Sequence, residues 1–138
     1  MTDAVEKSVS AVSIPNPNNY EGFTLWQRAN KWEKYVNSYL KQFNLNQAEA
    51  FHLISLAWLL NNKGEVTQTD LAQYVATTAM NTSKILKKLE INGLITRLTG
   101  TDSRSKALLI TEVGQEILRT SALGLGEANN QFFHTLGS

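Results

Sequence analysis

The segment at 46–61 constrains the fold most, because its helical pattern is apolar on nearly every face. A helix that is apolar all round has to be covered on all sides by the rest of its domain. Asn46 followed three residues later by Glu49 is typical of a capping pair and places the start of this helix. The sequence therefore predicts a helical domain whose core is centred on residues 46–61.

Further helices are expected on both sides of this central one. Apolar residues recur at spacings of three and four over 23–43, which predicts a long amphipathic helix. Thr67 and Asp70 form a second capping pair, at the start of a short helix that ends near residue 76. Val66, just before it, is expected in a short edge strand.

A helix–turn–helix followed by a hairpin is the arrangement expected next. A helix over 79–92 follows the short one closely, and Gly93 supplies the left-handed residue that ends it. The β-prone runs at 94–99 and 106–110 flank a polar turn and predict a hairpin. Thr111 caps a last helix that continues to about residue 135. Gly124 and Gly126 weaken this helix, and they either bend it or allow a neighbouring element to approach it closely. The expected fold class is mainly α with a small β-hairpin wing (α+β), a winged helix-turn-helix flanked by terminal helices.

Length and composition bound the remaining possibilities. The chain has 138 residues, enough for one domain with its own core, and no cysteine, which excludes disulfides, thiolate metal sites and cysteine nucleophiles. The longest apolar run, at 56–60, is too short to span a membrane, and no signal-peptide pattern begins the chain, so a cytoplasmic protein is expected. Residues 1–20 mix Ser, Asn and Pro, and we expect a flexible N-terminal arm.

The positive charge is concentrated in one window. Formal net charge is only +1, but residues 80–106 carry six basic and two acidic residues. Such clustering is expected where a protein surface meets phosphates.

The helix expected at 79–92 places much of that charge on one face. Its core-facing positions are Thr82, Ile85, Leu86 and Leu89, and its outward positions are Met80, Asn81, Lys84, Lys87 and Lys88. An Asn amide pairs with the adenine edge, whereas a Lys ammonium donates to guanine or neutralises a phosphate. The first amides of the helix are also free to bind a phosphate. An exposed face of lysines is also what an ordinary solvated helix shows.

The hairpin favours the nucleic-acid interpretation. Its turn carries Arg104, with Lys106 and Arg97 nearer the base, where a structural turn needs only Gly, Asp and Ser. An Arg on a slim tip fits the narrow minor groove, where negative potential is concentrated. Asp102 is either a turn-forming residue or a partner that orients Arg104.

These segments together resemble the MarR-type winged helix-turn-helix regulators over residues 45–118. The matching motifs are Leu45-Asn46-Gln47-Ala48-Glu49, Val66-Thr67, Leu71-Ala72, Leu89-Glu90-x-x-Gly93-Leu94-Ile95-x-Arg97, Asp102-Ser103-Arg104 and Leu108-x-Ile110-Thr111-x-x-Gly114.

The resemblance implies a homodimeric repressor of transcription that binds a pseudo-palindromic operator in double-stranded DNA and is released by a small-molecule effector. Residues 21–138 would form the single domain, with 21–44 and 112–138 as dimerisation helices and 45–111 as the winged helix-turn-helix. By position, Ser83 and Lys84 match the family's usual Thr/Ser-Arg pair, Arg104 is the wing arginine and Asp102 its partner.

Two departures from the family pattern stand out. Thr77 and Thr82 occupy positions that are usually aliphatic, and the family's further C-terminal helix has no counterpart before residue 138. The first departure predicts a different packing of the recognition helix. The second is explained either by a truncated chain or by a dimer that uses fewer helices.

In this family, small aromatic effectors bind between the dimerisation helices and the winged domain. The aromatic residues that could line such a crevice are Trp32, Tyr35, Tyr39, Phe51 and Trp58, although an aromatic stripe is also what a core helix shows. His52 is expected in the core or an interface. We expect no metal, no cofactor and no enzyme activity, because no ligand cluster, catalytic pair or phosphate loop has convincing spacing.

The alternative is a winged helix that binds protein and not DNA, as an antirepressor does. A local excess of four positive charges leaves room for it. Binding to random duplex DNA at low salt separates the two, because phosphate contacts are strongly salt-dependent.

Overall fold

The computed structural model describes residues 3–9, 13–98 and 107–135. The chain forms two units, residues 1–31 and 32–138. The first unit contains helix α1 (Asp3–Val9), a 3-10 turn η1 (Pro17–Asn19) and the beginning of α2 (Glu21–Leu40). Part of the expected arm is therefore helical, since Asn16 caps η1 and Pro17 begins it. The side chains at 3–8 and 13–20 are all exposed.

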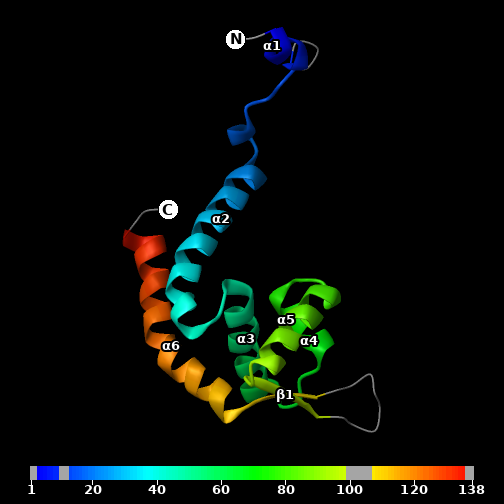
Figure 1. Ribbon diagram of the computed structural model, residues 1–138, viewed down its shortest axis with the longest axis vertical. Helices are drawn as coiled ribbons and strands as arrows, with labels where there is room; N and C mark the ends of the chain where they lie inside the picture. Colours follow the sequence, from blue (N-terminus) through cyan, green and yellow to red (C-terminus); the bar gives the residue numbers. More distant parts are fainter. Residues whose placement is uncertain (1–2, 10–12, 99–106, 136–138) are drawn as a thin grey trace. The chain divides into compact units, whose positions relative to one another are not determined.

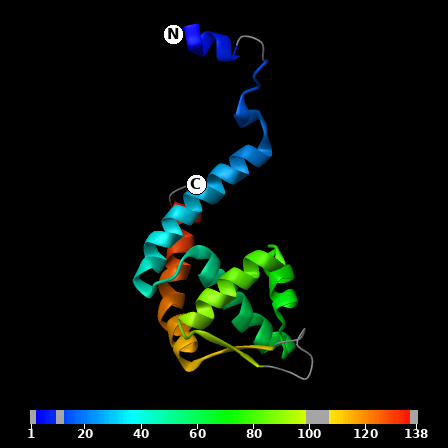
Figure 2. The same cartoon turned by 45° about the vertical axis from the view of Figure 1, so that its right-hand side comes forward.

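The second unit contains the rest of α2 and all later elements, which Figures 1 and 2 show from two sides. They are η2 (Lys41–Phe43), α3 (Gln47–Lys63), α4 (Gln68–Val75), α5 (Ala79–Ile91), β1 (Ile95–Leu98), β2 (Ala107–Ile110), α6 (Glu112–Asn130) and a π-helical turn η3 (Gln131–Thr135). This is the expected order of helices and hairpin, and the expected fold class is confirmed.

Helix α3 lies at the centre of the core, as predicted. It packs against α4, α5, α6 and β2, and its Leu53 and Leu56 are fully buried. The remaining buried core residues come from α2, α4, α5, both strands and the segments between elements, among them Val36, Leu40, Val66, Leu71, Leu86, Leu89, Ile95 and Leu108. Helix α6 adds the partly buried Ile117, Leu118 and Leu125. One large apolar side chain of α3, that of Trp58, is not covered by the surrounding elements and is 56% exposed.

Side-chain caps fix the starts of the helices. Asn46 and Glu49 form a reciprocal capping box on α3, and Thr67 and Asp70 form another on α4. Thr111 caps α6 by accepting the Gly114 N–H. These starts all agree with the predictions.

The hairpin follows directly from the end of α5. Gly93 adopts a φ of +79°, which confirms the expected left-handed residue, and β1 pairs antiparallel with β2 from Ile95↔Ile110 to Leu98↔Ala107. The strand expected at Val66 does not form. Val66 only accepts one backbone hydrogen bond, from the Leu108 N–H at 3.0 Å, because the α4 cap begins at the next residue.

Two glycines on α6 permit close packing. A Cβ on buried Gly114 would overlap the Leu94 carbonyl oxygen and the Ile110 side chain. A Cβ on Gly124 would overlap the Tyr39 ring, whose hydroxyl donates to the Ser121 carbonyl oxygen at 2.7 Å. Figures 1 and 2 both show α6 running alongside the end of α2, where the Gly124 contact occurs.

Candidate nucleic-acid interface

Helix α5 has one face in the core and one face in solvent. Thr82, Leu86 and Leu89 are buried, and Ile85 is half-buried. The opposite face is exposed and carries Met80, Asn81, Lys84, Lys87 and Lys88, with Ser83 half-buried beside them. The division of this helix into core and outward positions is as the sequence predicted.

The N-terminus of α5 is held by two threonines. The Thr78 hydroxyl caps the helix by accepting the Asn81 N–H at 3.1 Å. The Asn81 side-chain Nδ2 donates to the Thr77 hydroxyl at 2.9 Å. Thr77, one of the two departures from the family pattern, therefore orients an amide that the sequence assigned to base recognition.

The other departure, Thr82, is paired with the buried His52 on α3. Nδ1 of His52 lies 2.7 Å from the Ala48 carbonyl oxygen, which can only accept, so Nδ1 carries the proton. Nε2 is then free to accept from the Thr82 hydroxyl at 3.0 Å. Burial lowers the pKa of His52 below its ordinary value of 6.5 and keeps the ring neutral. His52 is a core histidine, as expected, and it anchors α5.

Lys88 forms a second polar link between the same two helices. Its Nζ lies 2.9 Å from Oε2 of Glu49, whose side chain is only 4% exposed. The other Glu49 oxygen, Oε1, accepts the Asn46 N–H at the start of α3. Lys88 therefore compensates a buried carboxylate, a role that the sequence pattern of α5 alone could not reveal.

Arg97, on β1, also faces protein groups. Its side chain is 20% exposed, and Nε lies 3.6 Å from Oε1 of Glu90 on the last turn of α5. Its Nη1 donates to Oε1 of Gln68 at 3.1 Å. Gln68 was not among the predicted site residues, because nothing in the sequence pairs residue 68 with residue 97.

Three predicted contacts in the wing, Asp102, Arg104 and Lys106, lie outside the described residues, so they stay predictions. The described strands place residues 98 and 107 opposite each other at the outer end of the paired region.

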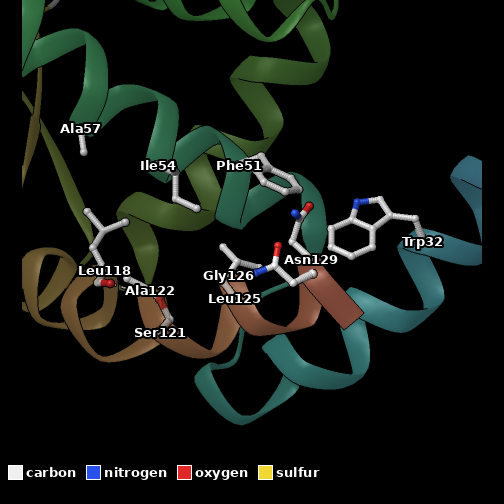
Figure 3. Close-up of a pocket in the computed structure, with 11 residues that line it drawn as sticks. Trp32, Phe51, Ile54, Ala57, Leu118, Ser121, Ala122, Leu125, Gly126 and Asn129 are labelled. Carbon is white, nitrogen blue, oxygen red and sulfur yellow. Dashed lines mark hydrogen bonds between the residues drawn. The ribbon is translucent and has the colours of Figure 1, made fainter. Parts of the chain in front are cut away.

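A cavity of about 580 Å³ lies between α3 and α6. Figure 3 shows Phe51, Ile54 and Ala57 of α3 facing residues of α6 across this space, with Trp32 at one end. The lining is mostly apolar, and the α6 residues are Leu118, Ser121, Ala122, Leu125, Gly126, Asn129 and Asn130.

Only two of the five aromatic residues expected in the effector crevice, Trp32 and Phe51, line this cavity. Trp58 lines an adjacent groove with β2 residues, because it lies further along α3. Tyr35 and Tyr39 line a third hollow with Gly124, Glu127 and Ala128 of α6. The Tyr35 hydroxyl donates to Gln131 of η3, and the Tyr39 hydroxyl donates to the Ser121 carbonyl oxygen of α6. Trp58, Tyr35 and Tyr39 thus lie outside this cavity, and the assignment of the five aromatic residues to an effector site stays a prediction.

Within the described ranges, no three His, Asp or Glu side chains gather as a metal site requires. None of the described helices is both long and apolar enough to cross a bilayer.

The comparisons with known proteins agree on one family. The sequence profile of the MarR family matches residues 51–106. The chain is 33% identical over 118 residues to YdcH of Bacillus subtilis (strain 168), an uncharacterized HTH-type transcriptional regulator, covering 85% of this chain and 80% of YdcH.

Two solved structures illustrate the same fold. MepR of S. aureus, solved in complex with DNA, superposes with a TM-score of 0.73 at 18% identity, covering 84% of this chain and 82% of MepR. AbsC, a MarR family transcriptional regulator from Streptomyces coelicolor, gives a TM-score of 0.74 at 18% identity, covering 91% of this chain and 84% of AbsC.

Proposed function

The chain belongs to the MarR family of HTH-type transcriptional regulators, and on that premise we propose that it is a homodimeric repressor that binds a specific operator in double-stranded DNA. A regulator of this kind acts by occupying a promoter and needs no catalytic step, and we assign it none. The main support for the proposal is the division of α5 into two faces: the inner face is buried in the core, and the outer face exposes lysines and an amide to solvent.

We assign base recognition to Asn81, Ser83 and Lys84, which lie in the N-terminal half of α5. The Asn81 amide is held by Thr77, and a fixed amide reads a base edge better than a free one because less rotamer freedom is lost on binding. Met80, which is 74% exposed, supplies an apolar contact for a thymine methyl group.

We assign phosphate contacts chiefly to Lys87, which is exposed and has no ion pair among the described residues. Lys88 is 59% exposed despite its pairing with Glu49, so it adds positive potential at the same face. In the wing, Arg104 oriented by Asp102 is proposed to enter the minor groove, with Lys106 at a phosphate.

A dimer places two copies of α5 on successive major grooves, on the order of 34 Å apart. We propose that the terminal helices form this dimer, as the family resemblance implies. MepR, whose fold this chain shares, has been solved on DNA, which supports the same use of the fold here.

The cavity between α3 and α6 is the proposed effector site. Its size suits a small aromatic molecule, and Trp32 and Phe51 supply aromatic walls. Phe51 is next to His52, which anchors α5, so a ligand that displaces α3 would also move the recognition helix. Small aromatic compounds that bind here should quench Trp32 fluorescence and release DNA. A compound that binds without changing DNA affinity would contradict the coupling.

A salt titration tests the DNA proposal. The wild type should bind random duplex DNA with micromolar affinity at low salt, with a steep fall as salt rises. Lys87→Ala should lower affinity for every sequence and reduce the salt slope by about 0.9, whereas Lys84→Ala should mainly relax base preference. Lys34→Ala, an exposed lysine on α2, is the matched control and should change neither.

A wild-type chain that binds no duplex at low salt would refute the proposal and favour the protein-binding alternative. Identical behaviour of Lys84→Ala and Lys87→Ala would refute the division of roles. Arg104→Ala should weaken operator binding strongly without changing the melting temperature, and an unchanged affinity would remove the wing from the mechanism.

A further inference from the structure

Gln68 connects the recognition helix to the wing. It is the first residue of α4, directly after the Thr67 cap, and it is half-buried. Its Nε2 donates to the carbonyl oxygen of Ala79, the first residue of α5, at 3.3 Å. Its Oε1 accepts from Nη1 of Arg97 on β1 at 3.1 Å. The two ends of one side-chain amide, a donor and an acceptor, thus contact two different elements at once.

Arg97 extends this connection to the other end of α5. Its guanidinium lies between Gln68, which reaches the first turn of the helix, and Glu90 in the last turn. Nε is buried and makes no hydrogen bond among the described residues, and Glu90, 3.6 Å away, balances its charge. Strand β1 is therefore connected to the last turn of α5 directly through Arg97, and to its first turn through Arg97 and Gln68 together.

The environment of Arg97 differs from that of a phosphate-binding cation. Its side chain is 20% exposed and already has a carboxylate and an amide as partners. With a fifth of its side chain exposed and its charge already balanced by Glu90, Arg97 offers a phosphate much less accessible charge than an exposed lysine such as Lys87. Arg97 is thus better placed to hold the wing than to touch DNA.

We propose that Gln68 and Arg97 are positioning residues that fix the wing base relative to the recognition helix, so that both elements meet one DNA duplex in a single arrangement. This inference rests on the proposed DNA binding and changes the role that the sequence suggested for Arg97. A misaligned wing and helix would still be attracted to phosphates, but they would fit a specific operator poorly.

The test is a double-mutant cycle on DNA binding. Gln68→Met removes both hydrogen bonds at similar volume, and Arg97→Met removes the guanidinium. Each variant and the double variant are titrated by fluorescence anisotropy on an operator duplex, selected from a random pool, and on random duplex over a salt series. Circular dichroism melting reports folding, and Arg97→Lys, which keeps the charge near Glu90, replaces Arg97→Met if that variant does not fold.

Positioning predicts that each single variant loses about tenfold in operator affinity, with a smaller loss on random duplex. The double variant should lose little more than either single one, because both disrupt the same connection. The salt slope should stay at the wild-type value in all of them, because no phosphate contact is lost.

Direct contact predicts a different pattern. Arg97→Met would lower the salt slope by about 0.9, Gln68→Met would have no effect, and the losses would add. That result would overturn this inference and leave the proposed function intact. A wild type that binds no duplex would overturn both, and the wild-type titration alone identifies that case.

Discussion

The buried His52 predicts a pH dependence of stability that one substitution should remove. The imidazole is 4% exposed and hydrogen-bonded at both nitrogens, and burial lowers its pKa in the folded chain below 6.5. The unfolded chain therefore binds a proton near pH 6.5 that the folded chain does not. Stability rises with pH wherever the unfolded state binds more protons than the folded state. The contribution of His52 to the free energy of unfolding is therefore fully present above pH 6.5 and is lost as the pH falls below 6.5.

The size of the effect is limited by one proton per chain. The slope cannot exceed about 1.4 kcal/mol per pH unit, so a folded state that stays neutral loses at most about 1.4 kcal/mol between pH 8 and pH 5.5. The measurement is the free energy of unfolding from urea titrations at several pH values and one protein concentration.

His52→Gln should lower stability at pH 8 and lose most of this pH dependence. His134→Gln is the matched control, because that histidine is exposed, and it should keep the wild-type curve. An equal pH dependence in wild type and His52→Gln would show that His52 is not the group whose protonation destabilises the fold.

Three further substitutions test the packing and the charges. Leu86→Ala empties a fully buried site on α5 and should cost about 2–5 kcal/mol of unfolding free energy, whereas Ile91→Ala, 74% exposed on the same helix, should cost under about 0.5. Gly114→Ala should destabilise, because its Cβ meets a backbone carbonyl, while Gly126→Ala meets nothing and should stabilise by up to about 1 kcal/mol; equal effects would contradict the packing of α6. Lys88→Met should cost about 1–3 kcal/mol at pH 7 by leaving its buried carboxylate partner unpaired, and a loss of DNA affinity without a loss of stability would contradict that pairing.

The local elements were predictable because their signals are local. Asn46 with Glu49, Thr67 with Asp70, and Thr111 all lie within three residues of the amides that they cap. Gly93 marks the end of α5 by itself, since its positive φ is a property of one residue. The outward face of α5 followed from helical periodicity.

The partners across the fold were not predictable, because they depend on which elements meet. The sequence suggests that Arg97 and Lys88 are free cations. In the fold, Arg97 binds Gln68, 29 positions away, and Lys88 binds Glu49, 39 positions away. Trp58 lines a groove with β2 residues, and not the cavity between α3 and α6, for the same reason: helical periodicity gives the face of α3 on which a residue lies, but not which element packs against that part of the helix.

Selection of bound duplexes from a random pool would show whether the exposed face of α5 recognises a DNA sequence as part of a dimer. We expect enrichment of one inverted repeat whose two halves are centred about one helical turn apart, and loss of a defined base preference within each half for Lys84→Ala. Recovery of unenriched sequences by the wild type, or of a motif without two-fold symmetry, would contradict this expectation.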